Sequence, residues 1–184
     1  MRLMMWIVGG LLVLSTQIVP VGCGDGEAPI TCDAESCECR DRPNCDLDCV
    51  DIAECQPTCT AVGNECRGTC TAEDCEFRCK GAEKCEGLCG DSCYTSCSSV
   101  DVCRAETGDN SFYQCTNAGT CAAEIGDGSD VICTNVQSCN VRCVGTCTVV
   151  CLVTDTCNVE CLEGERTNCG QGQYTCGLEC PNAE

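Results

Sequence analysis

Two series of cysteines constrain the fold of this chain more than any other feature of its sequence. Cysteines recur every 18 residues in two series that run side by side, and each series has five members. An 18-residue unit is too small to bury its own apolar face, so it must stack on its neighbours. The two series therefore predict a solenoid with coils of about 18 residues. The first series is Cys79, Cys97, Cys115, Cys133 and Cys151, and the second is Cys85, Cys103, Cys121, Cys139 and Cys157.

The residues between the cysteines indicate that the coils are built from β-strands. Apolar and polar residues alternate in segments such as Cys139-Val141-Cys143, which is the period of a strand with one buried face. Residues four apart would also line a helix. The β-branched residues, the glycines and the absence of alanine between residues 133 and 161 favour strands. We therefore predict an all-β, disulfide-rich parallel β-solenoid, in which roughly eight coils would form a rod about 40 Å long.

Other residues follow the same 18-residue period. One row of small or apolar residues passes through Val100 and Val136, and another through Ala105 and Val141. Asn117 and Asn135 are also 18 apart, and we expect them to form a short amide ladder inside the rod. The cysteine spacing is less regular between residues 32 and 75, which predicts imperfect or capping turns. The pattern decays after Cys161, which predicts a closing cap.

The 29 cysteines indicate disulfides and an oxidising compartment. Cysteines four apart on one strand lie about 13 Å apart and cannot pair. Pairs within a coil, such as Cys97–Cys103, and pairs between equivalent cysteines of adjacent coils both remain possible. Residues 97–121 keep both series but lack the other two cysteine positions, which favours pairing within the coil. Two separate turn-bridging pairs are expected, namely Cys89–Cys93 and Cys143–Cys147.

The N-terminal segment has the pattern of an export signal. Arg2 precedes an apolar run over residues 3–21, which ends in the small residue Gly22 and is followed by the polar segment GDGE at residues 24–27. A basic start, an apolar run and a small-residue junction are typical of a cleaved signal peptide. A retained transmembrane anchor is the alternative, but the run is short and an acidic segment follows it. We predict a signal peptide over residues 1–22.

The junction Val21-Gly22-Cys23 resembles the lipobox of bacterial lipoproteins, although Pro20 stands where leucine is usual. The resemblance implies that Cys23 is lipidated and becomes the mature N-terminus, and that Gly24 directs the protein to the outer membrane. Removing Cys23 from the count leaves 28 cysteines, an even number that 14 disulfides would use. We expect a lipidated tether over residues 23–31, the solenoid over residues 32–180 and a tail over residues 181–184.

The charge of the chain excludes some partners. The net charge is −19, and the mature chain, with nine basic and 29 acidic residues, would carry −20. Such a surface disfavours nucleic acid and anionic lipid headgroups, so that membrane attachment would come from the N-terminal lipid.

A row of Gly-Asp dipeptides is a candidate cation site. Asp91, Asp109 and Asp127 each follow a glycine and lie 18 residues apart, so stacking would bring their carboxylates close together. Calcium would relieve the repulsion between them. Gly-Asp is equally an ordinary turn dipeptide, and we favour turns over calcium.

The remaining motifs do not predict catalysis. The chain has no histidine, no C-x-x-C and no phosphate-binding or nucleophile motif, so we expect no enzyme activity and no resident cofactor. The cysteine spacing, with threonine beside cysteine, is similar to that of the disulfide-stapled β-helical antifreeze proteins of insects, but the threonines form no regular row. The sequence predicts a cell-surface lipoprotein with a structural or interaction role, in adhesion or in the envelope. A calcium-binding repeat module and a thiol-metal buffer are the alternatives.

Overall fold

A computed structural model describes residues 30–32, 36–49, 52, 54–60 and 62–181. The predicted signal peptide and Cys23 lie outside these residues. The described part of the chain forms 13 strands in one hydrogen-bonded sheet. The strands are β1 (Ile30–Thr31), β2 (Ser36–Arg40), β3 (Asn44–Cys49), β4 (Gln56–Thr60), β5 (Glu65–Cys70), β6 (Glu76–Lys80), β7 (Lys84–Cys89), β8 (Tyr94–Thr107), β9 (Phe112–Ile125), β10 (Ser129–Cys143), β11 (Cys147–Cys161), β12 (Arg166–Gly170) and β13 (Gln173–Cys176).

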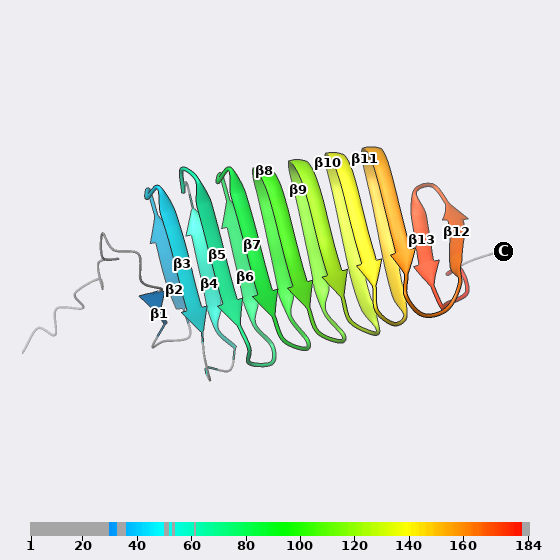
Figure 1. Ribbon diagram of the computed structural model, residues 1–184, viewed down its shortest axis with the longest axis horizontal. Coiled ribbons are helices and arrows are strands. Elements are labelled where there is room, and N and C mark those ends of the chain that lie inside the picture. The colour runs from blue at the N-terminus through cyan, green and yellow to red at the C-terminus, as the bar shows by residue number, and fades with distance from the viewer. Residues whose placement is uncertain (1–29, 33–35, 50–51, 53, 61, 182–184) are drawn as a thin grey trace, which may run out of the picture.

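The sheet winds into a parallel β-solenoid, as the sequence predicts (Figure 1). Each of the first three turns consists of two short strands, β2–β3, β4–β5 and β6–β7. Each of the next four is one long strand that bends in its middle, from β8 to β11. We call the layer of β2, β4, β6 and the first halves of β8–β11 the first face. The layer of β3, β5, β7 and the second halves of β8–β11 is the second face.

The bend between the two faces occurs at a residue with left-handed backbone. In β8 this residue is Ser99, with φ 56°, and the equivalent residues Asn117, Asn135 and Val153 have φ between 54° and 55°. Asparagine visits this conformation readily, because its short polar side chain bonds locally. A β-branched residue does not. Val153 is therefore an outlier in the row, and it is 79% exposed.

The 18-residue register is confirmed, and it extends further than the sequence pattern indicated. Cys97, Cys115, Cys133 and Cys151 lie opposite one another on successive coils. Cys39 and Cys59 continue this row toward the N-terminus at steps of 20 residues. The expectation of imperfect or capping turns between residues 32 and 75 is wrong for β2–β5, because these turns are complete. The phase slips there because the connections between the strands are longer.

The rod has about seven turns rather than eight. After β11 the chain reverses and forms a hairpin, in which β13 pairs antiparallel with both β12 and the first half of β11. The hairpin lies at the C-terminal end of the stack (Figure 1). The sequence counted these residues as an eighth coil. They form the closing cap that the decay of the pattern after Cys161 predicts.

The interior is filled by cystine and by pairs of large and small residues that face each other. Phe77 and Tyr113 are both 1% exposed, on the first face. Gly87 lies across from Phe77 on the same turn, and Ala123 lies across from Tyr113. The aromatic rings fit because the opposite layer carries only small residues, which keeps the thickness of the rod nearly constant.

Candidate functional site

The structure contains 14 disulfides, which use all 28 cysteines that follow Cys23 in the sequence. Seven of them cross from the first face to the second within one turn, beside the left-handed bend. They include the pairs that the sequence favoured over pairs between coils. The seven are Cys39–Cys45, Cys59–Cys66, Cys79–Cys85, Cys97–Cys103, Cys115–Cys121, Cys133–Cys139 and Cys151–Cys157.

A second set of disulfides closes the opposite corner of the coil. It includes the expected pairs Cys89–Cys93 and Cys143–Cys147, and also Cys49–Cys55 and Cys70–Cys75. Where this set is interrupted, buried serines take its place. Ser111 accepts a hydrogen bond from the amide of Cys93 at 3.1 Å, and Ser129 accepts one from the amide of Ser111 at 3.0 Å. The corner is therefore tied together along the rod even in coils without this disulfide.

The Gly-Asp row stacks at this same corner. Asp91 accepts a hydrogen bond from the amide of Asp109 on the next coil at 2.9 Å, and Asp109 accepts one from Asp127 at 2.7 Å. A Cβ on Gly108 would lie 2.1 Å from a carboxylate oxygen of Asp91. Each aspartate thus occupies the space left by the next glycine, and this arrangement gives the row a role in stacking the turns.

Asp127 ends the row and has the strongest set of donors. Its Oδ1 accepts hydrogen bonds from the amide of Thr146 at 2.7 Å and from the hydroxyl of Thr146 at 2.6 Å. These bonds favour the ionised carboxylate and lower the pKa of Asp127, although the side chain is exposed to solvent. Calcium binding by the row stays a prediction.

Among the described residues, two groups of three metal-ligating side chains have their ligand atoms within 4.8 Å of one another. They are Cys32, Cys49 and Cys55 at one end of the rod, and Cys143, Cys147 and Cys176 at the other. Every one of these sulfurs belongs to a disulfide. The thiolate that a metal needs is not present in a disulfide. The described part of the chain therefore offers no thiolate for the proposed metal buffer.

The predicted asparagine ladder exists, but it lies on the surface. The amide of Asn135 donates to Oδ1 of Asn117 at 2.7 Å, and both side chains are exposed at the left-handed bend. The expectation that it lies inside the rod is wrong, because at the bend the residue points outward. A second ladder was not expected from the sequence. Asn158 donates to Asn140 at 2.8 Å on the second face.

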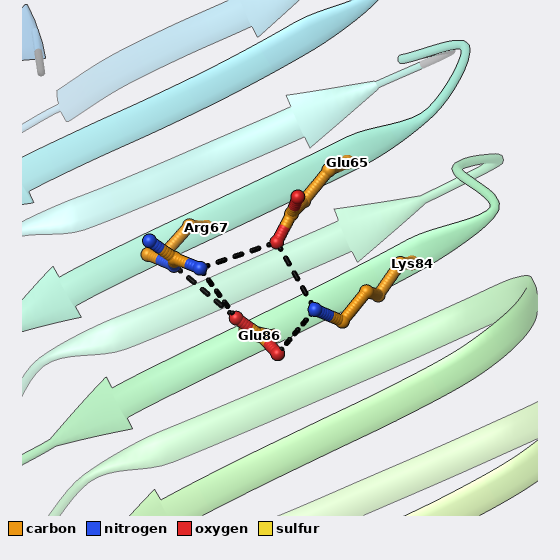
Figure 2. Close-up of polar contacts among 4 residues, drawn as sticks. All are labelled: Glu65, Arg67, Lys84 and Glu86. Carbon is orange, nitrogen blue, oxygen red and sulfur yellow. Dashed lines mark hydrogen bonds and ion pairs between the residues drawn. The ribbon is translucent and has the colours of Figure 1, made fainter. Parts of the chain in front are cut away.

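Four charged residues on β5 and β7 form a closed network on the second face (Figure 2). Arg67 contacts Glu86 at 2.8 Å and Glu65 at 3.2 Å, and Lys84 contacts the same two carboxylates at 2.6 Å and 3.2 Å. Hydrogen bonds from Lys84 and then from Arg67 lower the pKa of Glu86 against the opposing effect of its partial burial. Both carboxylates are thereby engaged by cations of their own two coils.

The next coil leaves an arginine without such a partner. Arg104 lies beside Glu86 in the register, but Glu86 already contacts Arg67 and Lys84. Within the part of the chain that the structure describes, the guanidinium of Arg104 forms no hydrogen bond or ion pair. Arg104 lines two adjoining hollows on the second face, of about 470 and 260 Å³. The sequence analysis did not identify this arginine as functional.

Comparisons with known proteins found no family model, no curated protein and no solved structure that matches the chain. The described residues include no helix with the length and apolar character needed to cross a membrane. The protein is therefore defined by its own architecture, a disulfide-stapled parallel β-solenoid. Its disulfides indicate an oxidising, extracytoplasmic location.

Proposed function

We propose that the protein is an exported, lipid-anchored rod that displays its sheet faces at the cell surface and acts there by binding or by structural contact. The observation that carries the proposal is the complete pairing of the 28 cysteines after Cys23. A rod whose coils are each held by disulfides keeps a fixed shape without a large apolar core, and this suits a module that works outside the cell.

The pairing also supports the proposed role of Cys23. Because the other 28 cysteines bond among themselves, none is left as a partner for this one. Cys23 stands at the lipobox-like junction Val21-Gly22-Cys23, where lipidation would consume its thiol. A lipid at this point would attach the N-terminal end of the rod to the membrane, with the stack of coils extending from it.

Lipid labelling of the full-length chain in a bacterial host tests the anchor. An alkyne-bearing fatty acid is expected to label the wild-type protein and to leave Cys23→Ser unlabelled. Labelled protein is expected in the outer-membrane fraction, and Gly24→Asp is expected to shift it to the inner membrane. Equal labelling of the wild type and Cys23→Ser, or an unlabelled wild type, would refute the lipid anchor.

A further inference from the structure

The two hollows beside Arg104 form one groove along the second face, which we call the axial groove. Both hollows share Arg104 and Glu106, and their outer walls follow two rows of register partners. The groove crosses β5, β7, β8, β9, β10 and β11, or five steps of the sheet, which makes it about 24 Å long. It is shallow, and it runs parallel to the axis of the rod. Its shape suits an extended chain.

The groove concentrates the positive charge of an acidic molecule. Residues 85–184 contain 14 acidic residues but only three basic ones, Arg104, Arg142 and Arg166. All three line the larger hollow. Arg142 contacts Glu124 at 3.1 Å, and Arg166 donates to the backbone carbonyl of Val159 at 3.2 Å. Arg104 has the unpartnered guanidinium described above, which is free to bind a carboxylate with two hydrogen bonds.

The floor of the groove offers polar groups rather than apolar pockets. The row that begins at Arg104 continues through Ala122, Asn140 and Asn158. Ala122 leaves a depression between the arginine and the two amides. Each amide presents both donors and acceptors, which are the groups that sugar hydroxyls require. In the row, a cation thus precedes a neutral hydrogen-bonding surface.

We propose that the axial groove binds an extended glycan chain that carries spaced carboxylates. A peptide fits less well, because apolar anchor pockets are lacking and the strands that form the floor of the groove are already paired with each other. A nucleic acid would bring a charge at every unit and would be repelled by the net charge of −19. The inference rests on the proposed function, since it names the partner of the displayed rod.

The test uses the full-length, oxidised protein in detergent and an oligogalacturonate as the probe, with binding measured by calorimetry at about 0.15 M salt. Arg104→Gln is expected to weaken binding about tenfold, because a bidentate charged contact is lost. Arg78→Gln is the matched control, since it removes the same charge from the first face, and it is expected to change affinity less than about twofold. Equal losses in the two variants would overturn the proposal, because binding would then follow overall charge.

A second pair of variants tests the shape of the groove. Ala122→Phe fills the depression and is expected to abolish binding, while Ser96→Phe places the same ring on the first face and leaves binding unchanged. A wild-type protein that does not bind the oligogalacturonate, or that binds a poly-glutamate peptide more tightly, would overturn the glycan assignment. Neither result would affect lipid labelling at Cys23, so failure of the groove and failure of the anchor are distinguishable.

Discussion

The ring of Phe77 occupies the space that a side chain on Gly68 would need. A Cβ at residue 68 would lie 2.3 Å from Cδ2 of Phe77, and one at Gly87 would lie 2.8 Å from Cδ1. Gly68 belongs to the preceding turn and Gly87 to the same turn as Phe77. One aromatic ring thus determines the residue at two positions of the opposite layer.

Gly68→Ala is therefore expected to destabilise the rod by overpacking, at a cost of about 1–3 kcal/mol. The measurement is denaturant unfolding of the oxidised protein. In a Phe77→Val background the same substitution should cost much less, because the ring no longer fills the space. Gly63→Ala is the control. Its Cβ would have a nearest neighbour at 3.6 Å, and little change is expected. Equal costs for Gly68→Ala in both backgrounds would contradict the packing argument.

Val153 is the β-branched residue in a row of left-handed bends. Val153→Asn is expected to stabilise the protein by about 1 kcal/mol, because asparagine adopts this backbone with less strain. Its amide would also lie next to Asn135 and extend the surface ladder. The reciprocal variant, Asn135→Val, should lose stability in thermal unfolding. If both variants had the same sign of effect, strain at the bend would not be the cause.

The carboxylate of Asp127 is expected to stabilise the corner of the coil only while it is ionised. Because hydrogen bonds lower its pKa in the folded state below the ordinary value of 3.8, its contribution is complete above that pH. The contribution is lost as the pH falls through the lowered pKa. Asp127→Ala should reduce stability at neutral pH, and the difference from wild type should shrink in acid. Asp130→Ala, on the same coil, should have little effect at either pH, which unfolding curves at both values would show.

Burial raises the pKa of Tyr113 far above the ordinary value of 10. The folded state therefore binds a proton that the unfolded state loses above about pH 10. The stability that depends on the neutral phenol is present below that pH and falls as the pH rises above it. Tyr113→Phe should make alkaline unfolding less steep in pH by one proton. An unchanged slope in urea unfolding between about pH 9 and 11 would contradict the burial of this hydroxyl.

The sequence predicted the features that repeat and missed those that depend on three-dimensional position. The spacing of Cys97 and Cys115 defined the coil, and the loss of the other cysteines in residues 97–121 indicated the pairing within it. The coil of Cys39 and Cys59 was not recognised, because a longer corner changes the spacing without changing the register. The reversal into β12 was missed for a similar reason, because residues 166–176 keep cysteines and glycines after the repeat has ended.

The groove was beyond sequence reasoning for a different reason. Arg104, Arg142 and Arg166 are scattered through the sequence, and only the register of the coils and the folding back of the cap bring them to one hollow. The scarcity of basic residues after Lys84 was the signal available. The Gly-Asp row, in contrast, was visible in the sequence. Its stacking role follows from the close approach of Asp91 to Gly108, which the dipeptide alone does not specify.

The intact mass of the protein purified from cells, before and after alkylation without reductant, tests the central claim most directly. The account predicts a chain that begins at Cys23, carries acyl mass and gains no alkyl groups, since the 28 remaining cysteines form 14 disulfides. Peptide mapping of the same sample should join Cys97 to Cys103. Alkylation of several cysteines, or a bond between Cys97 and Cys115, would contradict the disulfide-stapled rod.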